Sequence, residues 1–180
     1  MTKMIVIRHF KPLVDKNKPV AEWGLDEQGM KDMEELLQNP LLRQLKKVLS
    51  SPEKKALITA RAISEKFNVP LEEVKLVAEV DRSKGGYVEG DYTEIVRTYL
   101  NKEEFKYAWE SRDHVEARIK AFVDTIQKEE PFALISHGMF LSIMLHKYFN
   151  ENLVAFWKNL RFGHILEVEV DDLVKIWNND

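Results

Sequence analysis

Two histidines and an arginine stand at the ends of two apolar segments that lie far apart in the chain. Arg8 and His9 follow the apolar run 4–7, and His137 follows the run 132–135 after a single serine. Apolar, β-branched runs of this length are typical of buried parallel strands. Because ligands of open α/β sheets bind at the carboxyl ends of the strands, we expect these side chains to face one crevice. A crevice with this charge suits an anion, and phosphate is the commonest candidate.

The chemistry that these residue types allow is phosphoryl transfer. A histidine acts as a nucleophile when a hydrogen bond fixes one ring nitrogen and the target lies in line with the other. Phosphoryl transfer mainly requires positioning and neutralisation of charge. Arg8 offers a planar fork for phosphate oxygens, and Gly138 opens an expected helix whose first N–H groups can face an anion. Lys55 lies in the first turns of another expected helix, which Ser51 caps.

Alternating strands and helices would position these groups. The expected strands are 3–8, 46–50, 73–78, 132–136 and 164–170, with 173–177 pairing with the last strand through the Asp171-Asp172 turn. The expected helices start after the caps Asp26, Ser51 and Asp113, near Thr93, which opens a helix to Trp109, and at Gly138, which opens a helix to about Phe149. This order predicts a three-layer α/β/α sandwich with a largely parallel central sheet.

Composition narrows the class of protein. The chain has 180 residues, a net charge of −3 and no cysteine. The length fits one domain, the charge gives no general attraction to nucleic acid or anionic membrane, and thiolate chemistry is excluded. No apolar stretch reaches the roughly 20 residues of a membrane helix. We therefore expect a soluble, cytoplasmic protein that binds neither nucleic acid nor membrane, with any anion site built locally.

Five motifs match one known family in order and spacing over essentially the whole chain. They are Ile7-Arg8-His9 after a strand, Leu25-Asp26-x-x-Gly29 at a helix start, the run 50–60 (SSPEKKALITA), Glu79 before a glycine-bearing loop, and Ser136-His137-Gly138. On these motifs the chain resembles the histidine phosphatase superfamily, also called the phosphoglycerate mutase-like family. The resemblance implies a single domain over residues 1–180, with a cleft-lining insertion around 80–112.

The resemblance also implies roles for individual residues. His9 would be the catalytic nucleophile that forms a phosphohistidine, and Glu79 would protonate the leaving oxygen. Arg8, Lys55, His137 and Gly138 would bind the phosphoryl group, and His137 would also stabilise its developing charge. The implied activity is that of a phosphoric monoester hydrolase acting on a small phosphorylated substrate, with no cofactor.

Departures from the family pattern leave several points open. The family usually has glycine where Phe10 stands and arginine where Lys55 stands; lysine keeps the charge but loses the bidentate fork. Asp81 and Glu89 compete with Glu79 for the role of general acid. Phe10 either shifts the backbone or lines the substrate pocket.

Two other functions stay open beside the phosphatase. One is a non-catalytic module that binds phosphorylated ligands, and the other is a phosphoglycerate mutase-type isomerase. The sequence fixes neither the substrate nor the oligomeric state. His114, His146 and His164 show no metal-binding spacing, so we expect no metal site. We expect Tyr87, Tyr92 and Trp109 to be candidates for the walls of the cleft.

Overall fold

The computed structural model describes residues 2–85, 87–126 and 130–179. A central sheet of five strands has the order β3-β2-β4-β1-β5. The strands are β1 (Lys3–Arg8), β2 (Lys47–Ser50), β3 (Leu71–Glu73), β4 (Phe132–Ser136) and β5 (Ile165–Glu169). β1, β2, β3 and β4 run parallel, and β5 lies antiparallel to β1 at one edge. The expected three-layer α/β fold with a largely parallel sheet is confirmed.

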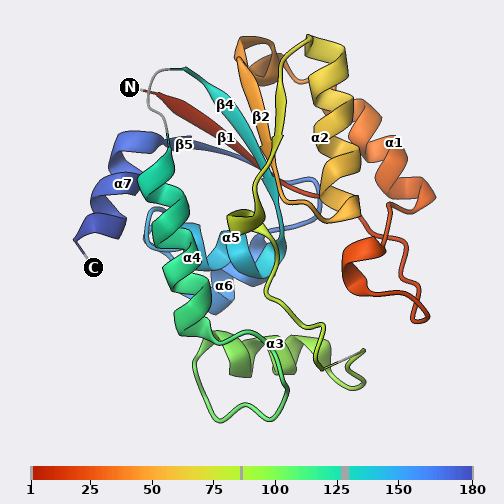
Figure 1. Cartoon of the computed structure of the whole chain (residues 1–180), viewed down its shortest axis with the longest axis vertical. Helices are drawn as coiled ribbons and strands as arrows, with labels where there is room; N and C mark the ends of the chain where they lie inside the picture. The colour runs from red at the N-terminus through yellow and green to blue at the C-terminus, as the bar shows by residue number, and fades with distance from the viewer. Residues whose placement is uncertain (1, 86, 127–129, 180) are drawn as a thin grey trace.

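Helices cover both faces of the sheet (Figure 1). They are α1 (Glu27–Leu36), α2 (Lys54–Phe67), α3 (Tyr92–Leu100), α4 (Arg112–Thr125), α5 (Gly138–Leu145), α6 (Leu153–Asn159) and α7 (Val170–Asn178), with short 3-10 turns η1 (Val20–Glu22), η2 (Pro40–Gln44) and η3 (Lys75–Val77). In Figure 1, α1 and α2 lie on one side of the sheet, and α4, α5, α6 and α7 lie on the other.

Alternating side chains of the strands feed two separate hydrophobic cores. In β1, Met4 and Val6 pack into the core under α4 and α5, whereas Ile5 and Ile7 pack into the core under α1 and α2. The inner strands are buried on both faces, which explains why their sequences read as continuous apolar runs rather than alternating ones.

Two predicted caps are displaced in the structure. α2 begins at Lys54 with Glu53 at its N-cap, and not at Ser51. The Ser51 amide still donates to Ile135 O of β4 at 3.0 Å, so the chain keeps its strand direction for longer. α4 is capped by Ser111, whose side chain accepts from the His114 amide, and not by Asp113. The carboxylate of Asp113 is paired with Lys102 at 2.7 Å instead.

One predicted strand and two predicted helices are too long. The third strand stops at Glu73 and turns into η3, which buries Val77, so only the start of 73–78 is extended. The helix expected to reach Trp109 stops at Leu100, shortly before Lys102 adopts a left-handed φ of 55°. The helix expected to reach Phe149 stops at Leu145.

The final predicted strand, 173–177, is wrong because this segment belongs to α7. Val170, Leu173 and Trp177 are its buried residues, and their spacing of three and four is that of one helix face. Short alternating apolar runs fit a strand and an amphipathic helix alike, and here tertiary packing favours the helix.

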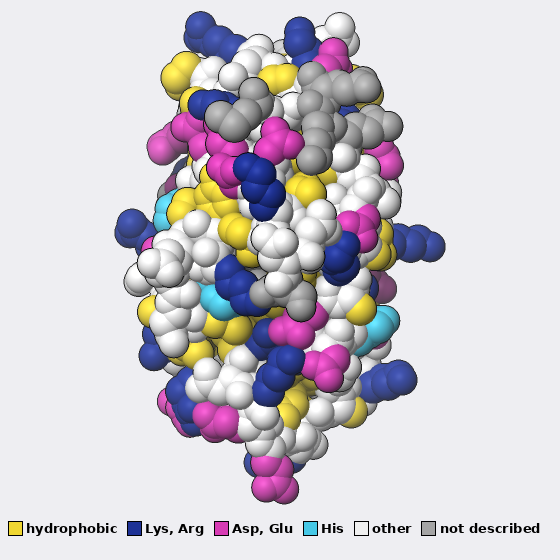
Figure 2. Space-filling model, turned by 90° about the vertical axis from the view of Figure 1, so that its left-hand side faces the viewer, with side chains coloured by type: hydrophobic (Ala, Val, Ile, Leu, Met, Phe, Trp, Pro, Cys, Tyr) yellow, Lys and Arg dark blue, Asp and Glu magenta, His cyan; other side chains and the backbone are white. Residues whose placement is uncertain are grey.

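Surface charge is dispersed on the face that Figure 2 shows, where acidic and basic side chains lie interspersed rather than in a patch of one sign. Elsewhere along the described chain some surface charges form local ion pairs, such as that of Lys120 with Asp124 at 2.6 Å. In the described part of the chain, no helix is both long and apolar enough to span a membrane.

Candidate active site

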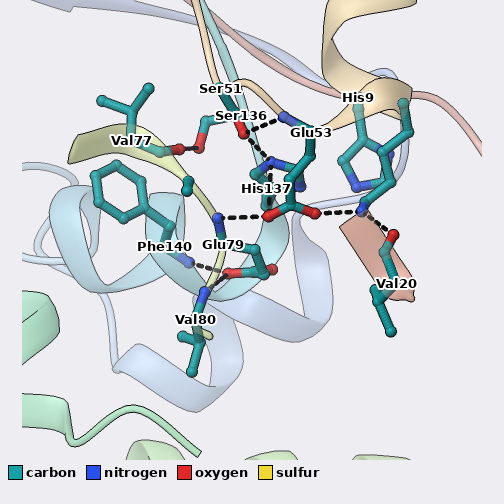
Figure 3. Close-up of polar contacts among 12 residues, drawn as sticks. His9, Val20, Ser51, Glu53, Val77, Glu79, Val80, Ser136, His137 and Phe140 are labelled. Atoms are coloured by element: carbon teal, nitrogen blue, oxygen red, sulfur yellow. Dashed lines mark hydrogen bonds and ion pairs between the residues drawn. The ribbon is translucent and has the colours of Figure 1, made fainter. Parts of the chain in front are cut away.

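Three neighbouring strands bring the predicted site residues together at their carboxyl ends. In the sheet register Arg8 lies opposite Ser136, and Ser50 lies opposite Ile135, so β1, β4 and β2 end at one edge. The residues that follow each strand therefore share one space. The rings of His9 and His137, 128 positions apart, have their centroids 5.0 Å apart in an edge-on arrangement (Figure 3).

His9 is held in one tautomer by the backbone. Its Nδ1 atom lies 2.7 Å from the carbonyl oxygen of Phe10. A carbonyl only accepts hydrogen bonds, so Nδ1 carries the proton and Nε2 keeps its lone pair. Burial lowers the pKa of His9 well below its usual value, and the adjacent His137 and Lys55 lower it further. His9 is therefore a neutral imidazole with a free nucleophilic nitrogen.

His137 is fully buried at the N-cap of α5 and contacts the segment after β2. Its Nε2 atom lies 2.6 Å from Ser51 Oγ and 3.6 Å from Glu53 Oε1 (Figure 3). Burial is the main cause that lowers the pKa of His137 well below its usual value, and nearby cations, led by Lys55, lower it further. Its Nδ1 atom has no hydrogen-bond partner among the described residues.

Arg8 leans across the start of α5, where Gly138 makes room for it. A Cβ atom added at Gly138 would lie 2.9 Å from Arg8 Cζ, so a larger residue would displace the guanidinium. The guanidinium also lies 4.2 Å from the ring centre of Phe162 and donates to the carbonyl oxygen of Leu160. Burial lowers the pKa of Arg8, and the carboxylate of Glu79 opposes that shift. Its Nε atom is buried without a hydrogen-bond partner in the described chain.

Lys55 is buried and bound to a carboxylate within the chain. Its ammonium contacts Glu53 and donates to Val20 O at 2.9 Å. The side chain of Lys55 is 4% exposed and that of Glu53 is 12% exposed, so this is an interior ion pair. The second Glu53 oxygen accepts from the Glu79 amide at 3.0 Å. One carboxylate thus links Lys55, His137 and the backbone of Glu79, as Figure 3 shows for its contacts with His137 and Glu79.

Glu79 points its carboxylate at the N-terminus of α5. The oxygens accept from the amides of Phe140 at 2.9 Å and Met139 at 3.1 Å, and from the amide of Val80 (Figure 3). A helix N-terminus stabilises a carboxylate there. The residue also lines the same cavity as Arg8 and His9.

The two competing carboxylates are placed differently. Glu89 lines the same cavity as His9, whereas Asp81 lines two other cavities and not this one. Asp81 accepts from the Ser83 amide at 2.8 Å, and this hydrogen bond is the main cause that lowers its pKa. Glu79 also lines the cavity of His9, and its contact with the first amides of α5, where His137 is the N-cap, relates it more directly to the histidine pair than Glu89.

A cavity of about 490 Å³ is lined by Arg8, His9, Lys55 and Glu79, whereas the fully buried His137 is not among its lining residues. Its walls come from the loop between β1 and α1 and from the segment 79–92, which lie far apart in sequence. Tyr87 and Tyr92 line it, as the sequence suggested, but Trp109 is buried elsewhere. Phe10 does not line it; its ring is buried against Gly163, which has a φ of 71°.

Sequence reasoning missed four residues of this region: Ser51 as a partner of His137, Glu53, Arg82 and Phe162. Glu53 lies two residues before Lys55, and this spacing was the available signal. Arg82 and Phe162 reach the cavity from segments whose path the sequence does not fix.

The remaining histidines stand apart from the histidine pair. His114 pairs with Glu110 at 2.6 Å on the surface, and His146 Nδ1 contacts Glu151 O at 3.2 Å. The carbonyl oxygen of His164 accepts a hydrogen bond from the Arg8 amide at 3.1 Å, so the backbone of His164 supports the site. Across residues 2–85, 87–126 and 130–179, no group of three acidic or histidine side chains could hold a metal ion.

Known proteins share this architecture. The structure is similar to that of the mycobacterial glucosyl-3-phosphoglycerate phosphatase, with a TM-score of 0.70 and 13% sequence identity. The match covers 92% of this chain and 89% of the phosphatase. It is also similar to phosphoserine phosphatase of Entamoeba histolytica in complex with 3-phosphoglyceric acid, with a TM-score of 0.68 and 20% sequence identity. This match covers 93% of this chain and 90% of the phosphatase. A third similar structure is YhfR of Bacillus stearothermophilus, with a TM-score of 0.73 and 17% sequence identity. The match covers 94% of this chain and 91% of YhfR. These likenesses show the fold.

Sequence comparison identifies the family. No curated protein sequence matches the chain. A family profile does match, over residues 5–173, and its family supports a phosphoric monoester hydrolase. The chain belongs to the histidine phosphatase superfamily (branch 1).

Proposed function

We propose that the protein hydrolyses a phosphomonoester through a covalent phosphohistidine on His9. The observation that carries this proposal is the fixed tautomer of His9, whose Nδ1–H donates to Phe10 O while the residue lines the cavity beside Arg8 and Lys55. A neutral imidazole is the nucleophilic form, and burial maintains that form.

In the first step the His9 Nε2 lone pair attacks phosphorus in line with the leaving oxygen. The N–P bond forms, the P–O bond to the alcohol breaks, and Glu79 donates a proton to the departing oxygen. Arg8, Lys55 and the backbone of Gly138 neutralise the charge on the equatorial oxygens, and the missing side chain of Gly138 allows the close approach of Arg8. His137 adds a hydrogen bond to the same oxygens.

In the second step water releases the phosphate. Glu79, now a carboxylate, takes a proton from water, the water oxygen attacks phosphorus, and the P–N bond breaks to restore neutral His9. The amides of Met139 and Phe140 stabilise the carboxylate form that this step needs. The first step starts from the protonated acid, and the proton taken from water in the second step restores it.

The substrate in this proposal is a small phosphorylated molecule, and the whole chain acts as one domain with the segment 80–112 beside the cleft. The neighbouring structures are named for different phosphate esters, glucosyl-3-phosphoglycerate and phosphoserine. The phosphate ester is thus the shared feature that supports the proposal. In this proposal the cavity walls determine which leaving group the protein accepts.

Trapping the phosphoenzyme tests this proposal. His9→Ala is expected to abolish both turnover and acid-labile labelling by a 32P-labelled ester, and so is His9→Asn, whose side chain fills more of the space that the imidazole leaves. The circular dichroism spectrum of both variants should be unchanged. His114→Ala serves as the matched control, because this histidine lies on the surface. Full activity in folded His9→Ala would refute the nucleophile. Vanadate binding without hydrolysis in the wild type would favour a phospholigand-binding module instead, and primer-dependent isomerisation would favour a mutase.

A further inference from the structure

Apolar side chains are concentrated around the catalytic cavity. Six large hydrophobic side chains are exposed in the described part of the chain, and four of them line this one cavity: Val14, Tyr87, Tyr92 and Phe162. Exposed apolar side chains are ordinary when scattered, but gathered in a concave surface they mark a ligand site. This clustering calls for an occupant with an apolar surface.

Neutral polar side chains, which pair readily with the hydroxyls of a sugar or a polyol, are scarce in the same walls. Among the described residues that line the cavity there is no serine, threonine, asparagine or glutamine. Trp23 has a single donor, Nε1, and it is already used on Asp15 O at 2.8 Å. The other polar side chains of the outer walls are charged, and Lys16 and Arg82 already contact Tyr87 and Tyr92, so a hydroxyl-rich leaving group would have to compete with those contacts for its hydrogen bonds.

Aromatic rings begin directly beside the nucleophile. The Phe162 ring centre lies 5.6 Å from that of His9, and Arg8 lies over the same ring. Further from His9, the Lys16 ammonium lies 4.6 Å from the Tyr87 ring centre, and Arg82 donates to the Tyr92 hydroxyl at 2.9 Å. Within the described chain, neither Lys16 nor Arg82 forms an ion pair with a carboxylate.

We infer that the substrate is a phosphomonoester whose alcohol carries an aromatic ring. The inference rests on the proposed phosphatase activity. The phosphoryl group binds at His9 and Arg8, and the ring of the leaving group packs among Phe162, Tyr87 and Tyr92. Aromatic pairs in such arrangements gain attraction beyond the area that they bury, and Lys16 and Arg82 add cation–π contacts to the ring.

Three esters of primary alcohols, with similar leaving-group chemistry, test the inference. They are 2-phenylethyl phosphate, 2-cyclohexylethyl phosphate and glycerol 1-phosphate. We expect kcat/KM to be about ten-fold or more higher for the phenyl ester than for the glycerol ester, with the cyclohexyl ester in between. Equal values for the phenyl and glycerol esters overturn the inference, and a cyclohexyl ester as good as the phenyl ester overturns the aromatic assignment.

A variant pair connects the preference to the cavity wall. Tyr87→Ala is expected to lower the phenyl-to-glycerol ratio several-fold and to leave inhibition by inorganic phosphate unchanged. Leu13→Ala is the matched control, since Leu13 is also an exposed large hydrophobic residue but does not line the cavity. An unchanged ratio in Tyr87→Ala overturns the placement of the ring. If no ester is hydrolysed, the proposed activity fails on its own, and calorimetric affinities of the three esters must still show the same order for the inference to stand.

Discussion

The carboxylate of Glu53 contacts the ammonium of Lys55 in the interior beside the cavity, so the cation expected to bind phosphate already has an anionic partner. A lysine lacks the rigid fork of an arginine and needs external acceptors to fix its position. Glu53 and Val20 O supply them. The same carboxylate also carries a negative charge close to the expected phosphate, so it both orders the cation and repels the ligand.

Glu53→Gln separates these two effects. We expect inorganic phosphate to inhibit the variant about 3- to 10-fold more tightly, because one negative charge near the ligand is removed. The free energy of unfolding should fall by about 1–3 kcal/mol, because Lys55 keeps only neutral acceptors. Inhibition constants and urea unfolding measure the two quantities, with Glu34→Gln on the exposed side of α1 as the control. Weaker phosphate inhibition would show that ordering of Lys55 outweighs repulsion.

Glu79→Gln tests which carboxylate transfers the proton. The amide keeps the shape of the side chain and one acceptor for the α5 amides but cannot donate or take the catalytic proton, so kcat should fall about 10²- to 10⁴-fold. Glu89→Gln and Asp81→Asn should retain most of the activity. Steady-state kinetics with an ester of a poorly activated alcohol measures the difference. A larger loss in Glu89→Gln than in Glu79→Gln would transfer the role to Glu89.

The sequence predicted the parts of the site that follow buried strands. The ends of β1 and β4 were recognisable because each follows a run of four apolar residues, 4–7 and 132–135, and parallel pairing then brings Arg8, His9 and His137 to one edge. Such strands are determined by local sequence, so their ends are too.

The parts that it missed depend on contacts between distant segments. Phe162 approaches His9 because the turn after α6 docks on β1, where the Gly163 amide donates to Arg8 O at 3.1 Å. Ser51 resembles a helix cap by composition, yet its hydroxyl is taken by His137, 86 positions away. Local preference cannot reveal a partner that only the folded chain supplies.

Phe10 replaces the glycine usual in the family, and the structure accommodates it at Gly163. A side chain at Gly163 would meet the Phe10 ring, and its φ of 71° disfavours other residues by itself. Gly163→Ala should therefore destabilise the protein by about 1–2 kcal/mol from the backbone and by about 1–3 kcal/mol more from overpacking.

A double-mutant cycle isolates the contact. In a Phe10→Gly background, Gly163→Ala should cost only the backbone part, which leaves a coupling energy of about 1–3 kcal/mol between the two positions. Urea unfolding of the four proteins measures it. Additive effects would mean that Phe10 moves away at no cost and that Gly163 is required for its backbone conformation alone.

The buried histidine pair makes stability depend on pH. Burial lowers the pKa of both His9 and His137 in the folded state, whereas in the unfolded chain both have a pKa of about 6.5. Below that pH the unfolded state binds more protons than the folded state, so the free energy of unfolding is highest above about pH 7 and falls as the pH is lowered. Each histidine contributes a slope of up to about 1.4 kcal/mol per pH unit. Urea unfolding between about pH 7 and pH 5.5, where few carboxylates titrate, should show this slope. His9→Asn and His137→Asn should each lower the slope by up to about 1.4 kcal/mol per pH unit, which corresponds to one proton. A slope that neither substitution changes would place the proton uptake on other groups and would contradict a neutral His9 in the folded protein.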